Sequence, residues 1–166
     1  MKKFELTAES KINIFGKKLF RIKALISFGD VKEGETGGWV EKEENLEQSS
    51  GNAWVYGDAE VYGNAEVYGN ARVYGDARVS GDAMVSGNAE VYGNADYTTI
   101  RGFGTQFRAT TFFRCKDKQI RVSCGCFFGT ISEFREQVKN TRKGKIAEEY
   151  LMIADLMEKH FAEEAK

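Results

Sequence analysis

A six-residue repeat of apolar and polar positions fills the middle of the chain. Eight consecutive units at residues 51–98 read Gly, Asn or Asp, Ala, a variable residue, Val, then Tyr or Ser, and the last unit has Tyr97 in place of Val. Val favours an extended strand, in which alternate side chains point to opposite faces. Gly and Asn or Asp tolerate the positive φ of a tight turn. Each unit therefore predicts one short strand and one corner, with seven inward valines: Val55, Val61, Val67, Val73, Val79, Val85 and Val91.

This pattern resembles the hexapeptide-repeat proteins, which form left-handed parallel β-helices. The resemblance implies three hexapeptides per coil, about 18 residues, so that residue i lies beside residue i+18. Eight units then give a short prism that needs a cap at each end. The outward ladders expected from this register are Trp54, Arg72 and Glu90 beside Tyr56, Tyr74 and Tyr92; Glu60, Arg78 and Asp96 beside Tyr62, Ser80 and Thr98; and Glu66 with Met84.

The segment before the repeat predicts a β-hairpin cap. Apolar residues between 4 and 26 flank a turn at residues 15–18, and a loop at 27–38 leads to the repeat. Trp39-Val40 and Leu46 are six residues apart and are interpreted as degenerate early rungs. The first region is therefore placed at residues 1–38 and the β-helix at 39–98.

The segment after the repeat, residues 99–166, predicts a β-hairpin followed by two helices. Residues 110–115 and 120–124 flank a turn at 116–119, which would place Cys115 near Ile120 and Cys124 near Thr111. Thr130 and Glu133 have the spacing of a capping box. The first helix has the apolar stripe Ile131, Phe134 and Val138. The second has Ile146, Tyr150, Ile153, Met157 and Phe161, a stripe expected to pack against the end of the β-helix.

The composition predicts a cytoplasmic protein without a membrane segment. It is 42% hydrophobic and 30% charged, with 18 Gly and no Pro. No stretch approaches the roughly 20 apolar residues that span a bilayer, and no apolar run follows the N-terminal lysines. Three cysteines without framework spacing fit a reducing compartment.

A basic block stands out within a chain whose net charge is −1. Residues 97–145 contain eleven Lys or Arg and three Asp or Glu, and several phenylalanines lie among them. Arginines beside aromatic rings suit a nucleotide, whose phosphate and base they bind. The alternative is a capping layer with buried phenylalanines. The candidate ligand-binding residues are Arg101, Phe103, Phe107, Arg108, Arg114, Lys116, Lys118 and Arg121.

Catalytic and metal chemistry find little support in the repeat. Enzymes with the β-helix that this repeat resembles are mainly acyltransferases and zinc carbonic anhydrases, which use coil histidines. The only histidine here is His160, near the C-terminus. We therefore expect no catalytic residue, no metal and no cofactor. A cation between Asp58, Asp76 and Asn94 is the less favoured interpretation of residues that form turns.

The outward aromatic side chains predict a contact face. Trp54, Tyr56, Arg72, Tyr74 and Tyr92 would share one side of the β-helix, and exposed aromatic patches mark interfaces. We expect a homo-oligomer, with a trimer favoured because β-helices of the resembled family often trimerise through their flat sides. A solvated tyrosine face is the alternative.

Three segments together resemble hexapeptide-repeat proteins of bacteriophages and prophages. They are residues 28–40, the Gly-Asn-Ala-x-Val-Tyr array and the Cys-Gly-Cys-Phe-x-Gly-Thr run that begins at Cys124. The resemblance implies an accessory role in the host bacterial cell, including countering host defence. The expected function is non-enzymatic binding of an anionic nucleotide signal or a host defence protein. The alternatives are an oligomerisation module without a ligand and a divergent hexapeptide acyltransferase.

Overall fold

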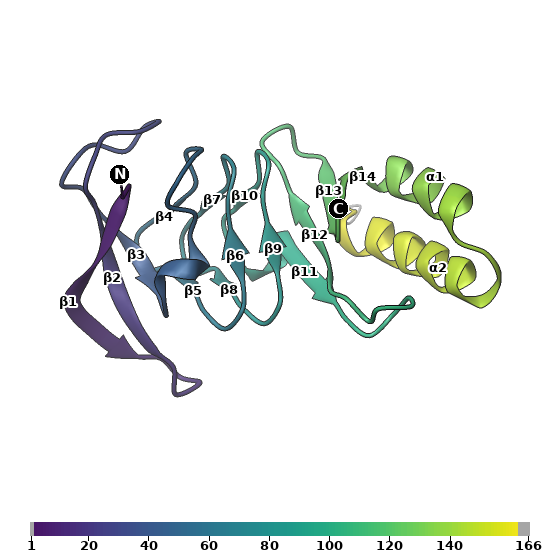
Figure 1. Cartoon of the computed structure of the whole chain (residues 1–166), viewed down its shortest axis with the longest axis horizontal. Coiled ribbons are helices and arrows are strands. Elements are labelled where there is room, and N and C mark those ends of the chain that lie inside the picture. The colour runs from purple at the N-terminus through teal and green to yellow at the C-terminus, as the bar shows by residue number, and fades with distance from the viewer. Residues whose placement is uncertain (1, 163–166) are drawn as a thin grey trace.

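The protein is a row of short parallel rungs between two different caps. The computed structural model describes residues 2–162. An antiparallel hairpin lies at one end, the rungs occupy the middle, and a second antiparallel sheet with two helices lies at the other end (Figure 1). The protein is thus mainly β with two helices.

The N-terminal cap is the predicted hairpin, and its sheet is extended by a strand that contains Trp39-Val40, the segment interpreted from the sequence as a degenerate early rung. β1 (Phe4–Ile12) pairs antiparallel with β2 (Lys18–Ala24), and the turn between them is closed by Asn13. β3 (Thr36–Val40) pairs antiparallel with β2 and parallel with β5 (Glu60–Val61). With β8 (Arg78–Val79), the hairpin and the rungs therefore share one sheet of order β1-β2-β3-β5-β8, and the expected boundary between residues 38 and 39 falls inside β3.

The repeat forms rungs of two-residue strands. Pairs join residues 18 apart, such as Val55 with Val73 and Val61 with Val79. All seven repeat valines are fully buried, as the alternation of the repeat predicts. β5 and β8 belong to the hairpin sheet, whereas the other rung strands form two further open sheets, β4-β7-β10 and β6-β9. The bounds of these strands are β4 (Trp54–Val55), β6 (Glu66–Val67), β7 (Arg72–Val73), β9 (Met84–Val85) and β10 (Glu90–Val91).

The corners bring backbone against backbone. Gly69 has φ +69°, and a Cβ on it would lie 3.0 Å from the backbone nitrogen of Gly87. A side chain at this corner would therefore be both strained by the backbone conformation and crowded by the next rung. At this corner, glycine thus sets how closely the two successive rungs approach each other.

Side chains cap the exposed edge of the first rungs. Lys3 Nζ donates a hydrogen bond to the Ala53 carbonyl at 3.1 Å, and Asn45 Nδ2 donates to the Ala65 carbonyl at 2.8 Å. Asn45 belongs to the short helix η1 (Glu43–Asn45). Leu46 and Val40 lie beside Val67 and Val61, as expected of degenerate early rungs. These contacts satisfy backbone groups that would otherwise remain unpaired at an open edge.

Two aromatic side chains predicted to face outward are buried by this cap. Trp54 has no exposed surface, because its ring packs edge-on against Phe4 and Phe28 at centroid distances of 6.3 and 5.4 Å. Tyr62 is 8% exposed and packs with Leu19 and Trp39 of the hairpin sheet. The repeat correctly places both side chains outside the rungs, but the hairpin sheet and its loop then cover that outer face.

The eighth hexapeptide is not a rung, which corrects the expectation from the sequence. Asn94–Asp96 form the short helix η2, and Tyr97 begins β11 (Tyr97–Ile100), which is antiparallel to β12 (Thr110–Arg114). The Asp96 carboxylate accepts from Arg114 Nε at 3.2 Å instead of extending the ladder of Glu60 and Arg78. Substitution of the inward Val by Tyr97 marks the end of the parallel stack.

The C-terminal cap is a four-stranded antiparallel sheet of order β11-β12-β13-β14. The predicted hairpin is present, but Cys124 lies opposite Thr110 and Ile120 opposite Arg114, one residue from the expected pairs. β13 (Ile120–Cys124) is followed by β14 (Phe127–Thr130), which the sequence did not indicate. A bridge between Ala89 and Cys115 joins this sheet to the rungs.

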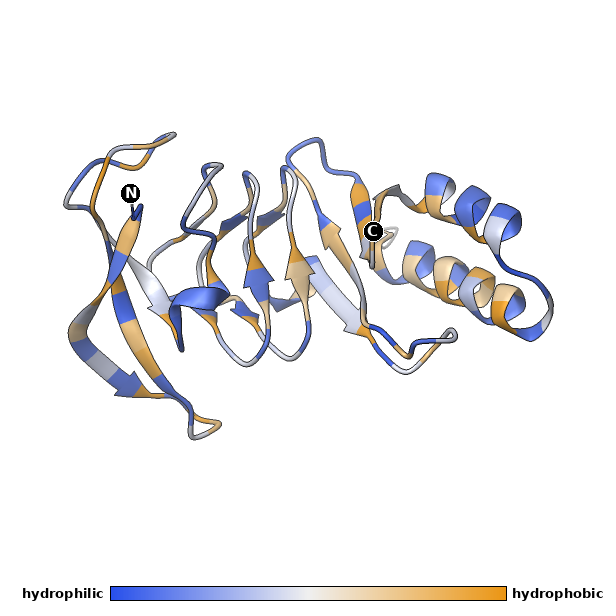
Figure 2. Ribbon diagram, in the orientation of Figure 1, coloured by the Kyte–Doolittle hydropathy of each residue, from blue (hydrophilic) through white to orange (hydrophobic). Residues whose placement is uncertain are grey.

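Two helices cover one face of the C-terminal sheet. α1 (Ile131–Thr141) begins at the predicted capping box, in which Thr130 Oγ1 accepts from Glu133 N at 3.1 Å. α2 (Gly144–Phe161) packs its apolar stripe on Phe112 and Val122 of the sheet and on α1. The stripe therefore contacts the C-terminal sheet and not the end of the rungs. Figure 2 shows the alternation of hydrophilic and hydrophobic residues along β1 and β2 and the apolar positions along α2. Within residues 2–162, no helix is both long enough and apolar enough to span a membrane.

Candidate ligand-binding site

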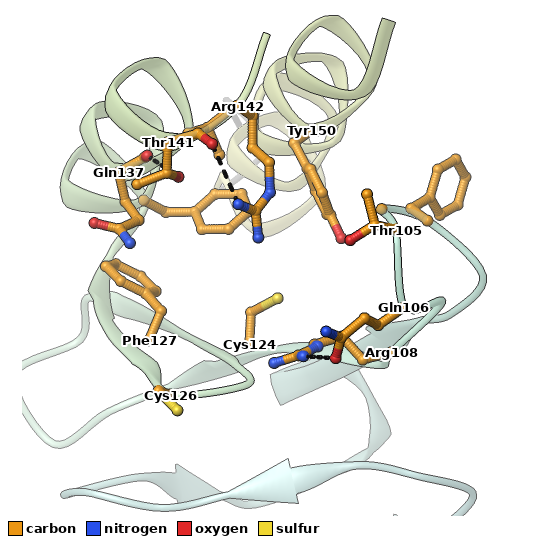
Figure 3. Close-up of a pocket in the computed structure, with 14 residues that line it drawn as sticks. Thr105, Gln106, Arg108, Cys124, Cys126, Phe127, Gln137, Thr141, Arg142 and Tyr150 are labelled. Atoms are coloured by element: carbon orange, nitrogen blue, oxygen red, sulfur yellow. Dashed lines mark hydrogen bonds between the residues drawn. The ribbon is translucent and has the colours of Figure 1, made fainter.

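A cavity of about 210 Å³ lies where the helices, the β13–β14 turn and the 101–109 loop meet. The side chains drawn in Figure 3 reach it from all three directions, with Arg142 above, Arg108 below and Tyr150 at one side. The lining residues are Phe103, Gly104, Thr105, Gln106, Arg108, Cys124, Cys126, Phe127, Phe134, Gln137, Val138, Thr141, Arg142 and Tyr150.

Local structure fixes the walls of this cavity. Tyr150 of α2 packs edge-on against Phe134 of α1, with ring centroids 5.9 Å apart. Gly104 has φ +80°, and a Cβ on it would lie 2.5 Å from the Tyr150 hydroxyl oxygen, so only glycine allows the loop this close. Gly125 turns the chain between β13 and β14 with φ +60°, and a Cβ there would collide with the Arg108 guanidinium.

Two arginines at the cavity have no carboxylate partner among the described residues. Arg142 follows the last turn of α1, and its guanidinium donates only to the Thr141 carbonyl, at 3.2 Å. The guanidinium of Arg108 donates to the Gln106 side-chain oxygen. Arg101, Arg114, Arg121 and Arg135, in contrast, each contact an aspartate at 2.5 to 3.2 Å. Among the described residues, the guanidinium groups of Arg108 and Arg142 therefore contact neutral oxygens only.

The polar groups beside the arginines are neutral hydrogen-bonding groups. Burial raises the pKa of the Tyr150 hydroxyl above its ordinary value, and the neighbouring Arg142 and Arg108 partly oppose this shift. Tyr150 therefore stays protonated at neutral pH and can donate a hydrogen bond. Gln137 and Thr141 project from the last turns of α1 toward the same space (Figure 3).

The three cysteines lie in different surroundings. Cys124 points into the cavity, where its Sγ accepts from Thr110 Oγ1 at 3.1 Å, whereas Cys126 is exposed at the turn (Figure 3). Cys115 is buried against the rungs, and burial raises the pKa of its thiol to about 11. All three are free thiols. Among residues 2–162, no three His, Cys, Asp or Glu side chains gather as a metal site would require.

The structure divides the basic block of the sequence among several surfaces. Of the eight candidate ligand-binding residues, only Phe103 and Arg108 line the cavity. Arg101 pairs with Asp82 on the rungs, and Arg114 pairs with Asp96. The other four lie outside the cavity: Phe107 is exposed beside it, and Lys118 is exposed in the β12–β13 turn. Lys116 and Arg121 line a second depression of about 460 Å³ with Asp117 and Phe128.

The sequence did not indicate most of the residues that line the cavity. Arg142 belongs to a basic turn between two predicted helices, and Tyr150 belongs to an apolar stripe assigned to the core. The position of Arg142 directly after the amphipathic segment was the available signal. It could not show that the loop before β12 lies opposite this helix end, because no local pattern encodes that contact.

The predicted aromatic face is only partly exposed. The rings of Tyr56, Tyr74 and Tyr92 stack on successive rungs with centroids 4.6 Å apart. Tyr92 is 53% exposed, whereas Tyr56 and Tyr74 are half-buried. Arg72 lies beside them and contacts Asp30 at 2.7 Å. Trp54, the fifth member of the predicted face, is buried beneath the N-terminal cap, so it is not part of the exposed face.

Comparison with known proteins bears on the repeats and not on this cavity. The YdcK beta solenoid repeat family matches residues 65–79 and 77–93, which include β6, β7, β8, β9 and β10. The matched segments therefore support a repeat β-solenoid protein. No curated protein matches the chain. His160, the only histidine, lies exposed near the end of α2, away from the rungs.

Proposed function

We propose that this protein is a non-enzymatic binding protein that holds a small anionic, aromatic ligand in the cavity at its C-terminal cap. The observation that carries the proposal is the pair Arg108 and Arg142, both without a carboxylate partner among the described residues. Guanidinium groups bind phosphate and carboxylate through paired hydrogen bonds. The rings of Phe127, Phe134 and Tyr150 supply an apolar wall for the rest of the ligand.

The volume of the cavity limits the size of the ligand to that of one nucleotide at most. Sites for drug-sized molecules usually have volumes of about 300 to 1,000 Å³, and this cavity has about 210 Å³. We therefore favour a nucleoside monophosphate over a cyclic dinucleotide. Its phosphate would lie between Arg108 and Arg142, and Gln137 and Thr141 would hydrogen-bond to the base or the sugar.

Calorimetric titration with AMP, GMP, CMP and UMP tests this function. At least one should bind, and the matching nucleoside and inorganic phosphate should each bind more weakly because each lacks half of the contacts. Removing a hydrogen bond to a charged group costs about 1.5 to 3 kcal/mol, so Arg142→Gln or Arg108→Gln should weaken binding roughly tenfold or more.

Arg101→Gln is the matched control, because Arg101 is exposed, pairs with Asp82 and lies outside the cavity. Its affinity should equal that of the wild type. Failure of all four nucleotides to bind would reject the nucleotide ligand. Equal losses in the Arg101 and Arg142 variants would show that binding depends on overall charge and not on this cavity.

A protein partner is the second candidate, and the tyrosine stack favours it. Tyr92 is the exposed end of that stack, and exposed tyrosines are common in interfaces. A host protein or another subunit of a homotrimer would contact Tyr92 and Tyr74. Replacement of Tyr92 by Ser should then abolish capture of the partner without affecting nucleotide binding.

The remaining finer features are proposals of the same kind. We propose that the rungs wind as a left-handed β-helix with about 18 residues per coil, as the resembled hexapeptide family does. The pairing of residues 18 apart supports this register. A phage accessory role in the cytoplasm of the host, countering its defence, is the setting that the sequence resemblance suggests. An experimental structure would test the handedness, and expression in infected cells would test the role.

A further inference from the structure

The turn between β1 and β2 presents three large apolar side chains to solvent. Ile12, Ile14 and Phe15 are 71, 75 and 62% exposed. Single exposed apolar residues are ordinary on a protein surface, whereas a cluster of them marks a contact surface. Lys17 and Lys18, both exposed, follow directly in the sequence. The tip of this hairpin, residues 12–18, is therefore apolar and basic.

The hairpin tip is held in one conformation before it meets a partner. Asn13 Oδ1 accepts hydrogen bonds from the backbone nitrogens of Phe15 and Lys17 at 2.9 and 3.0 Å. Asn13 Nδ2 donates to Glu60 Oε1 on β5 at 3.0 Å, which ties the tip to the rungs. The Phe15 ring lies 6.3 Å from that of Tyr62. Such preorganisation lowers the entropic cost of binding.

A groove of opposite charge lies on another face of the same chain. It has a volume of about 420 Å³ and is formed along β6 and β9 and beside η1. Its apolar floor contains Val67, Tyr68 and Met84, and Glu44 and Glu66 are exposed at its edges. Glu47 also lines it, but its carboxylate already accepts from the Gly69 backbone nitrogen at 3.0 Å. The carboxylates of Glu44 and Glu66 therefore remain available to pair with lysines of a partner.

We propose that the hairpin tip of one chain docks in this groove of a second copy. Ile14 and Phe15 would cover Tyr68 and Met84, and Lys17 and Lys18 would pair with Glu44 and Glu66. Within one chain the tip is tied to β5, whereas the groove runs along β6 and β9, which form a different sheet. A chain therefore does not fill its own groove. Repetition of such a contact closes a ring or extends a filament.

A second copy fits the tip better than an anionic membrane does. Segments that bind acidic lipids carry clusters of about four to eight basic residues. Only Lys17 and Lys18 are exposed at this tip, since Lys11 is half-buried and lies 3.6 Å from Glu60. The groove offers both an apolar floor and two exposed carboxylates, which match the two features of the tip.

Sedimentation velocity over a wide range of concentration tests the contact. The wild type should associate, and higher salt should weaken the association because exposed ion pairs are screened. The double variants Lys17→Glu/Lys18→Glu and Glu44→Lys/Glu66→Lys should each be monomeric. The quadruple variant, in which both charges are reversed, should associate again, which simple loss of folding in a double variant would not allow.

Controls use exposed side chains elsewhere. Met152→Ser and Leu156→Ser should leave association unchanged, because both side chains are exposed on α2, away from the hairpin tip and the groove. A monomeric wild type overturns the proposal, as does a quadruple variant that stays monomeric while its circular dichroism matches that of the wild type. A monomer that sediments with phosphatidylserine vesicles, and loses this binding on Ile14→Ser, would assign the tip to a membrane instead.

Discussion

The ring of Trp54, in the first repeat strand β4, lies edge-on to that of Phe28, with centroids 5.4 Å apart. Phe28 comes from the loop between β2 and β3, so this contact joins the N-terminal cap to the repeat. The buried tryptophan thus turns an outward position of the hexapeptide into part of the core.

Replacement of Trp54 by Ala should therefore destabilise the fold strongly. Deleting a buried aromatic side chain typically costs about 3 to 5 kcal/mol, which urea unfolding would measure. Tyr92→Ala is the matched control, because Tyr92 is 53% exposed and should cost much less. Equal losses in the two variants would contradict the burial of Trp54.

Gly69→Ala should destabilise the rungs more than Gly81→Ala. Both glycines have positive φ, +69° and +67°, so both substitutions carry the same backbone strain of about 1 to 2 kcal/mol. A Cβ at residue 69 also lies 3.0 Å from Gly87 N, whereas at residue 81 nothing lies within 4 Å. The difference between the two midpoints of thermal unfolding therefore measures the destabilisation caused by crowding between successive rungs. Identical midpoints would show that the two rungs can move apart at this corner without loss of stability.

Because of Lys3, the stability of the folded protein should rise with pH in the alkaline range. Burial lowers the pKa of its ammonium group from 10.5 to about 8. Between these pH values the unfolded chain binds more protons at this site than the folded chain, so the free energy of unfolding increases with pH. Between pH 8 and 10.5, the free energy of unfolding of the wild type should therefore rise by up to about 3 kcal/mol relative to that of Lys3→Met.

Urea unfolding of both proteins at several pH values measures this gain. The thiol of Cys115, with its pKa raised from 9.0 to about 11, acts in the opposite direction. It is common to both proteins and cancels in their difference. A difference that does not change with pH would contradict the burial of the Lys3 ammonium.

The capping box at Thr130 should stabilise the helix that forms one wall of the cavity. Thr130→Ala removes the hydrogen bond from Glu133 N and should cost about 1 kcal/mol. Ser132→Ala, at an exposed position in the first turn of α1, should change stability little. Hydrogen exchange should show faster exchange at the start of α1 only in the Thr130 variant. Equal exchange rates in both variants would show that the capping box does not stabilise the start of α1.

The three thiols should react with iodoacetamide in the order of their exposure. Cys126 should react first, Cys124 more slowly, and Cys115 last because it is buried and its pKa is raised to about 11. Mass spectrometry of the modified peptides measures the three rates. A nucleoside monophosphate in the cavity should slow the reaction of Cys124 and leave that of Cys115 unchanged. Rapid modification of Cys115 would contradict its burial.

The candidate site could be predicted from the sequence only in part. Basic and aromatic residues cluster after the repeat, and two of the eight residues chosen there, Phe103 and Arg108, reach the cavity. Arg101 and Arg114 do not, because Asp82 and Asp96, which lie earlier in the chain, pair with them. Composition indicates the charge of a segment, but it does not indicate which carboxylates will meet it.

The hexapeptide sequence by itself determined the rungs, because Val, Ala and Gly recur where a strand, a tight corner and a positive φ each require that residue type. It also determined both hairpins and the capping box, whose signals are local. Only the tertiary structure decided which outward side chains remain exposed. Trp54 and Tyr92 both occupy outward positions next to the inward Val of their units, but the N-terminal cap covers Trp54 and leaves Tyr92 in solvent. Contacts between segments distant in sequence make this difference, and no periodic pattern records them.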